Sequence, residues 1–147
     1  MKVTLVIAAG IAALVAAAAA LAAKPPIFAQ PKALGTIKTP LTLPVKPGAM
    51  VLDTITIQPG GNFGWHTHGS PVAVIITSGT LTVFDPSVAS CTPFKVSKGQ
   101  SFIEPANHVH LARNDTTKAV TLYAMYLGIP KGVMPNKPST QPAGCSA

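Results

Sequence analysis

The chain has 147 residues, a length that suits one domain with a modest hydrophobic core and not two. Charged residues make up only 10% of it, and 11 lysines and arginines against 4 aspartates and glutamates give a formal net charge of +7. The basic residues are scattered, whereas a nucleic-acid-binding surface concentrates its charge on one element. We therefore expect no nucleic-acid partner.

The first part of the chain has the layout of an export signal. Met1-Lys2 is a short positive start, and residues 3–23 carry no charge. Ala20-Leu21-Ala22 provides a small-x-small cleavage site, so we expect residues 1–22 to be a signal peptide. A cleaved signal would make the protein secreted or periplasmic and leave it without membrane contact. The alternative is an uncleaved membrane anchor, because the apolar run is longer than a usual signal core.

Residues 23–48 form a proline-rich segment that contains six prolines. Proline cannot donate a hydrogen bond to a β-ladder, so we predict an extended linker or an edge strand here. At the other end, residues 131–147 are again rich in proline. We call this segment the C-terminal tail and expect it to wrap the surface.

Between these segments, residues 49–130 show short alternating stretches that are typical of β-strands. Turn signals at Ser78-Gly79, Lys98-Gly99 and Asn114-Asp115 each separate two such stretches. Regularly spaced turns without helical periodicity predict an all-β domain, either an antiparallel barrel or a sandwich.

Cys91 and Cys145 are the two cysteines of the chain. An even pair in an exported protein indicates one disulfide, which would tie the C-terminal tail to a loop in mid-chain. The alternative is a reactive or metal-binding thiol.

The four histidines fall into two clusters with the same spacing, His66 and His68 in one and His108 and His110 in the other. On a strand, residues i and i+2 project to the same face, so His66 and His68 can both point into a barrel and share one ion. The second cluster lies on a strand that we predict within the same sheet system. Together they predict a metal site. Residues that could line a cavity above the ion, or belong to the ordinary core, are Phe63, Trp65, Phe102, Tyr123 and Met125.

The spacing around these histidines resembles the two motifs of the cupin superfamily, in particular of small secreted single-domain cupins. The first motif is matched by Gly60, His66, His68 and Gly79, and the second by Gly99, Pro105, Asn107, His110 and Asn114. The resemblance implies a cupin-type jelly-roll β-barrel that holds one divalent transition metal through His66, His68 and His110. The identity of the ion stays open among manganese, iron, copper, nickel and zinc.

Two positions depart from the family pattern. Asn107 replaces a glycine, a mild change because asparagine tolerates the left-handed conformation. Val72 replaces the glutamate of the first motif and cannot coordinate a metal. Three residues are candidates for the surroundings or rim of the site: Asp53, which shares a face with apolar residues of its strand, Glu104, which precedes Pro105 and is expected at the mouth, and His108.

A three-histidine site leaves coordination positions open, which is typical of catalytic rather than structural metal sites. By analogy with cupin-fold oxygenases, some of which use three histidines without an acid, we predict a dioxygenase-like oxidoreductase for a small organic substrate. One alternative is a non-catalytic cupin that binds a small molecule, a sugar or a metal, which Val72 and the scarcity of acid–base residues favour. Another is a metal-free barrel with structural histidines. A homodimer through an exposed edge strand is a further prediction.

Overall fold

The computed structural model describes residues 31–37 and 41–147. The predicted signal peptide, residues 1–22, lies outside the described residues. No helix among the described residues is long and apolar enough to cross a membrane.

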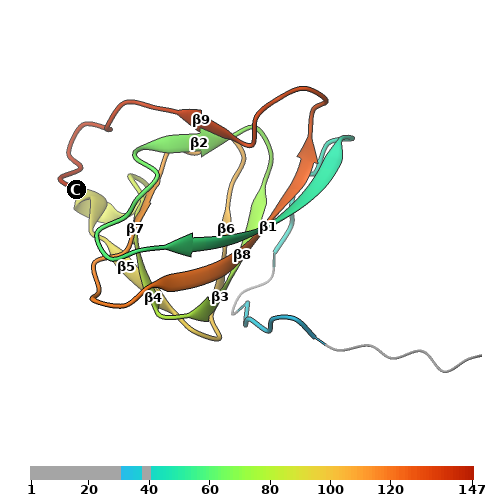
Figure 1. Cartoon of the computed structure of the whole chain (residues 1–147). Helices are drawn as coiled ribbons and strands as arrows, with labels where there is room; N and C mark the ends of the chain where they lie inside the picture. Colours follow the sequence, from blue (N-terminus) through green and yellow to red (C-terminus); the bar gives the residue numbers. More distant parts are fainter. Residues whose placement is uncertain (1–30, 38–40) are drawn as a thin grey trace, which may run out of the picture. The chain divides into compact units, whose positions relative to one another are not determined.

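The regular structure of the described residues consists of strands and one short 3₁₀ helix, which confirms the all-β prediction (Figure 1). The turn signals at Ser78-Gly79 and Lys98-Gly99 each lie between two strands, as predicted. In chain order the elements are β1 (Ala49–Ile57), β2 (His66–His68), β3 (Val72–Ser78), β4 (Thr80–Phe84), the 3₁₀ helix η1 (Ala89–Cys91), β5 (Phe94–Ser97), β6 (Ser101–Glu104), β7 (Leu111–Arg113), β8 (Val120–Ile129) and β9 (Asn136–Pro138).

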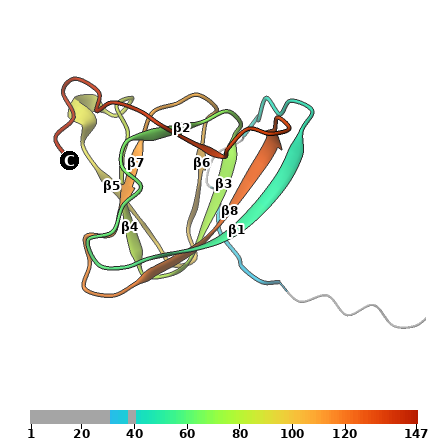
Figure 2. The ribbon, with the colours of Figure 1, turned by 45° about the horizontal axis from the view of Figure 1, so that its top comes forward.

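The strands form a four-stranded sheet in the order β1-β8-β3-β6, a three-stranded sheet in the order β5-β4-β7, and the pair β2-β9. The chain passes from one of the two larger sheets to the other between β3 and β4, between β5 and β6, between β6 and β7 and between β7 and β8. These two sheets face each other across the interior as in a jelly roll (Figures 1 and 2). Gly79 carries the chain from β3 to β4 with a φ of 77°, and a Cβ there would lie 3.0 Å from the Ala119 carbonyl oxygen. This crossing therefore requires glycine.

The main core fills the space between the sheets. Along β8, Val120, Leu122, Ala124 and Tyr126 are buried and point inward, whereas the residues between them lie on the outer face. This alternation follows from the two-residue period of a strand. It corrects our expectation for Tyr123 and Met125, which face away from the interior. Each fully buried Val or Leu stabilises the fold by roughly 1.5–3 kcal/mol.

A second, smaller cluster lies around the disulfide. Cys91 and Cys145 are bonded, with 5.1 Å between their Cα atoms, which confirms the predicted pairing. Both half-cystines are buried and pack with Trp65, Phe84 and Leu111. Trp65 thus belongs to this cluster and does not line the metal-site cavity.

The two proline-rich segments differ in what they contribute. Ahead of the barrel, Thr36 forms an isolated parallel bridge with Gln100. The C-terminal tail, which we expected merely to wrap the surface, contributes β9 and pairs with β2. β1 is an edge strand of its sheet, and Met50 and Leu52 are exposed on it. The homodimer stays a prediction.

Candidate metal centre

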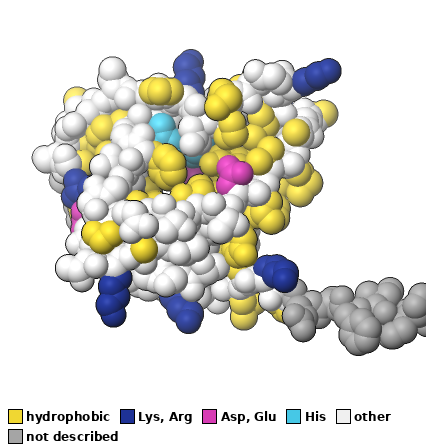
Figure 3. Space-filling view, in the orientation of Figure 1, with side chains coloured by type: hydrophobic (Ala, Val, Ile, Leu, Met, Phe, Trp, Pro, Cys, Tyr) yellow, Lys and Arg dark blue, Asp and Glu magenta, His cyan; other side chains and the backbone are white. Residues whose placement is uncertain are grey.

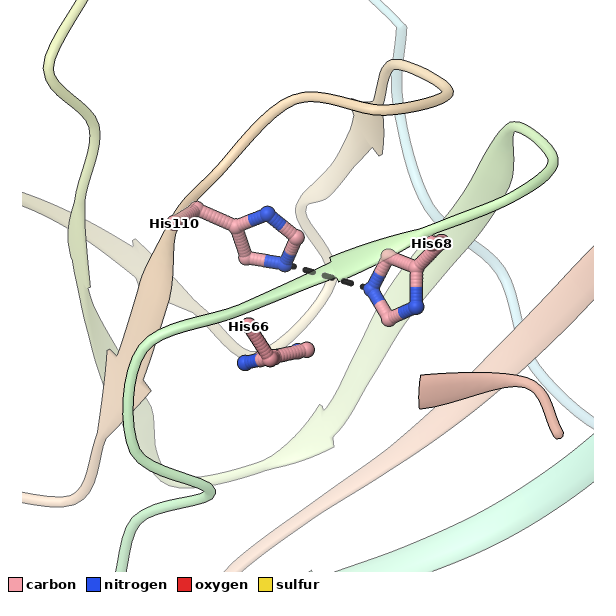
Figure 4. A group of neighbouring side chains, drawn as sticks. All are labelled: His66, His68 and His110. Atoms are coloured by element: carbon pink, nitrogen blue, oxygen red, sulfur yellow. Dashed lines mark hydrogen bonds between the residues drawn. The ribbon is translucent and has the colours of Figure 1, made fainter. Parts of the chain in front are cut away.

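Three histidines meet inside the barrel because two backbone segments pair. In β2, His66 and His68 are buried, while Thr67 points the other way. His66 and His110 face each other in a β-bridge, and each backbone N–H donates to the other's carbonyl at 3.0 Å. The pairing brings the three imidazole rings together, as Figure 4 shows. His110 is buried as well.

Each imidazole ring is oriented by a hydrogen bond from its Nδ1 to a backbone carbonyl. His66 donates to Gly64 at 2.9 Å, His68 to Pro135 at 3.1 Å and His110 to His108 at 3.0 Å. A carbonyl oxygen only accepts, so Nδ1 must carry the hydrogen in all three rings. In each neutral ring the lone pair is therefore on Nε2. This is the arrangement that metal-binding histidines show in proteins.

The distances between the rings match those of ligands that share one ion. The potential ligand atoms of the three histidines all lie within 4.8 Å of one another, and the Nε2 atoms of His68 and His110 are 3.2 Å apart. Two lone pairs at that distance need a proton or a cation between them. Nitrogen ligands about 2.1 Å from one metal, at right angles, lie about 3 Å apart. The donor set therefore fits a transition metal.

Glu104 reaches the cluster from β6 and contacts two of its three histidines. Its Oε2 lies 3.1 Å from His68 Nε2, and its Oε1 lies 3.2 Å from His110 Nε2. In the β3–β6 ladder Glu104 is directly opposite Val72, the position where the cupin motif has its glutamate. A carboxylate thus lies across the ladder from Val72, which has none. We expected Glu104 at the mouth of the site, and the structure places its carboxylate against two of the three histidines.

The electrostatics of the cluster keep Glu104 charged. Burial alone would raise the pKa of its carboxyl, but hydrogen bonds from His110 and His68, which each ring can donate only with a proton on Nε2, outweigh burial and lower the pKa to about 2. For His110, burial lowers the pKa, yet the contact with Glu104 raises it overall. Burial is the main reason that the pKa of His66 is lowered. A buried carboxylate among imidazoles favours a cation at this point.

The side chains of two predicted neighbours of the site, His108 and Asp53, make no hydrogen bond or ion pair with the cluster among the described residues. His108 turns away from the cluster, and its Nε2 is 2.6 Å from Asp85 Oδ1. It contributes to the site through its backbone carbonyl, which holds His110. Asp53 lies on the inner side of β1, opposite Ala124, and makes no hydrogen bond or ion pair with the cluster within the described residues. Its charge adds to burial and to the charge of Glu104 in raising the pKa of Tyr126 to about 12.

A small cavity of about 30 Å³ adjoins the cluster. It has room for one or two water molecules. In Figure 3 a histidine is visible in a hollow of the surface, with hydrophobic side chains among its neighbours. Of the predicted lining residues, Phe63 and Phe102 are confirmed. The whole cavity is lined by Ile55, Ile57, Phe63, His66, His68, Val74, Leu81, Phe102, Glu104, Ala112, Leu122, Ala124, Tyr126 and Asn136.

Among solved structures, the polyketide cyclase RemF from Streptomyces resistomycificus shares 13% identity over 66% of this chain, with a TM-score of 0.53. The DMSP lyase DddQ from Ruegeria pomeroyi shares 13% over 61%, with a TM-score of 0.52. The Bacillus halodurans protein BH2720 shares 19% over 58%, with a TM-score of 0.50. At these identities the likeness concerns the fold alone.

The match spans 65% of RemF, 43% of DddQ and 67% of BH2720. The matched part of this chain therefore spans less than two thirds of the length of RemF and of DddQ. No curated protein matches the chain by sequence. A family model described as "Cupin domain" matches residues 53–126, which is half of the chain. The chain therefore belongs to the cupin domain family.

Proposed function

We propose that this protein binds one divalent transition metal through His66, His68, His110 and Glu104. The observation that carries the proposal is the contact of the Glu104 carboxylate with both His68 Nε2 and His110 Nε2, at 3.1 and 3.2 Å. Imidazole nitrogens suit zinc, copper, iron and nickel, and a carboxylate also suits manganese. The proposed ligand set adds a carboxylate to the three histidines that the sequence predicted.

We propose further that the metal site serves the dioxygenase-like oxidation of a small organic substrate, with dioxygen as the oxidant. The metal would supply Lewis-acid or redox chemistry at positions that the four side chains leave free. The chain supplies a mostly apolar cavity that limits the access of water. Tyr126 lines this cavity, and because its pKa is raised to about 12 by burial, its hydroxyl keeps the proton. That proton is donated to Asn136 Oδ1 at 3.4 Å, and a substrate that accepts it would replace Asn136 as the partner.

The second candidate is a non-catalytic metal-binding cupin, and the size of the cavity favours it. A volume of about 30 Å³ accommodates water but not an organic molecule without movement of the walls. The identity of the ion helps to separate the two candidates. Zinc in structural sites is four-coordinate, so four protein ligands would satisfy it, whereas a six-coordinate ion would keep free positions.

The test is elemental analysis of the protein, purified without added metal or chelator, beside a His66→Ala/His110→Ala variant. We expect close to one transition metal per chain in the wild type and none in the variant. Wild-type protein that is metal-free and also fails to bind added zinc, copper, manganese or iron would contradict the proposal. Oxygen consumption by the loaded protein with a panel of thiols and catechols then separates the dioxygenase-like candidate from the non-catalytic one.

We also propose that the protein is exported, either secreted or periplasmic. The Cys91–Cys145 disulfide supports this, because disulfides persist in oxidising compartments. We expect the intact mass of the mature protein to correspond to a chain that begins after the Ala20-Leu21-Ala22 cleavage site. A mature protein that begins at Met1 would contradict cleavage.

A further inference from the structure

The C-terminal tail pairs with one edge of β2, the strand that carries two of the proposed ligands. β9 pairs with β2 over its whole length, with Pro138 opposite His66 and Asn136 opposite His68 (Figure 1). The pairing continues beyond β9, where the Ser139 N–H donates to the Trp65 carbonyl at 2.8 Å. The tail therefore holds β2 on one side, and the bridge between His66 and His110 holds it on the other.

The tail also reaches the metal site itself. The carbonyl that orients His68 belongs to Pro135, 67 residues away in the chain, whereas the carbonyls that orient His66 and His110 lie only two residues from them. Asn136 lines the cavity, and its Oδ1 accepts from the Tyr126 hydroxyl at 3.4 Å. His68 is thus the one imidazole of the three whose tautomer depends on a distant segment.

The disulfide anchors the tail beyond β9. Cys145 is bonded to Cys91 beside η1, and both are buried in the apolar cluster around Trp65. β9 itself has three residues in a two-stranded sheet, a unit that is marginal in water by itself. The segment from Ile129 to Cys145 is therefore held at both ends, by β8 and by the disulfide.

We propose that the C-terminal tail is a positioning element of the metal site and that the Cys91–Cys145 disulfide holds it in place. This inference rests on the proposed metal binding. Without the disulfide, β9 separates from β2, and His68 Nδ1 loses the Pro135 carbonyl. The ring then samples both tautomers and several orientations. Loss of the partner that orients a ligand lowers metal affinity by roughly 10–100-fold.

The test compares the Zn²⁺ affinity of the wild type with that of a Cys91→Ala/Cys145→Ala variant, in competition with a chromophoric chelator. We expect the affinity of the variant to fall by roughly 10–100-fold. Alanine is used because free thiols would bind Zn²⁺ themselves. The matched control is Ile76→Ala, at a fully buried core position that neither lines the cavity nor belongs to the tail. It lowers stability by about 2–5 kcal/mol but is expected to keep the Zn²⁺ affinity of the wild type.

A second measurement reads the orientation of His68 in metal-free protein. Long-range ¹H–¹⁵N correlation spectra at about pH 8 distinguish the two tautomers of a neutral imidazole, because the reference pKa of histidine is lower. In the disulfide variant the ring nitrogens of His68 should shift toward a tautomer mixture, while those of His66 and His110 keep their positions. A merely structural disulfide would affect all three alike or none.

An unchanged Zn²⁺ affinity in the disulfide variant, or unchanged ¹⁵N shifts at His68, would overturn the inference. Failure of the proposed function looks different, since the wild type itself would then bind no Zn²⁺. In that case the spectra of metal-free protein still decide whether the tail orients His68.

Discussion

At the scale of single residues, the candidate site differs from the cupin motif in the strand that carries its carboxylate, which is β6 and not β3. Val72 stands where the cupin motif has glutamate, and it is fully buried in the core. Glu104 is its direct partner in the β3–β6 ladder. Side chains of directly opposite residues lie on the same face with Cβ atoms about 5 Å apart, so either position can deliver a carboxylate to the same point.

The exchange can be tested by moving the carboxylate back. We expect Glu104→Val to lower metal affinity by at least roughly 10-fold, since it removes a proposed ligand. The double variant Val72→Glu/Glu104→Val is expected to recover most of that loss, because the carboxylate returns to the same face. The measurement is Zn²⁺ affinity by competition with a chelator. If the double variant binds no better than Glu104→Val, the two positions are not equivalent.

The same carboxylate makes the stability of the metal-free protein depend on pH. The pKa of Glu104 is lowered from 4.5 to about 2, so its contribution is present above pH 4.5 and is lost as the pH falls toward 2. The pKa of His110 is raised above 6.5, so its contribution is present below pH 6.5 and is lost as the pH rises through the raised value. The contact between Glu104 and His110 thus stabilises the fold most between pH 4.5 and pH 6.5, the ordinary pKa values of the two groups.

We therefore expect Glu104→Gln to lower the free energy of unfolding by roughly 3 kcal/mol near pH 5.5, and by less on either side. The measurement is urea unfolding of chelator-treated wild type and variant across this range. His66 and Asp85 also titrate with shifted pKa values, but they are present in both proteins. A difference between the two proteins that does not change with pH would contradict the assignment.

At the scale of elements, most strands and turns were predictable and the contacts between distant elements were not. The turns at Gly79 and Gly99 follow from glycines that flank alternating stretches. The position of Glu104 depends on the register between β3 and β6, which no local pattern contains. In β8 both faces carry apolar residues, so parity could not be chosen from the sequence, and Tyr123 was assigned inward instead of Tyr126. β9 has three residues and a proline, too few for a period to show.

One element contact that the motif does encode is the junction around Asn114. This side chain is fully buried, and its Nδ2 donates to the carbonyls of Ile57 at 2.9 Å and Lys118 at 2.8 Å. Its Oδ1 accepts from the backbone N–H and the hydroxyl of Thr116. It therefore ties the turn between β7 and β8 to the end of β1.

We expect Asn114→Ala to lower the free energy of unfolding by roughly 2–4 kcal/mol, because buried carbonyls lose their donors. The control is Asn62→Ala, which removes an exposed hydrogen bond to Gly64 and should cost less than about 1 kcal/mol. Both values come from urea unfolding of metal-free protein. Equal losses in the two variants would show that burial of the junction does not matter.

At the scale of the whole molecule, the disulfide closes the C-terminal tail over the barrel. It joins residues 54 apart in the chain, so the unfolded protein with the bond intact contains one large loop. In the chain-entropy model, closing a loop of this length removes conformational freedom from the unfolded state and stabilises the fold by about 4 kcal/mol. The buried cluster around Trp65 adds native contacts that depend on the same bond.

We expect the Cys91→Ala/Cys145→Ala variant to lose about 4 kcal/mol of unfolding free energy in the absence of metal. Its urea m-value should rise, because an unfolded chain without the cross-link exposes more surface. The rise in m-value separates the two sources of the loss, since native contacts alone would lower stability at constant m. A loss of stability with an unchanged m-value would therefore assign the effect to the folded state and to the packing around Trp65.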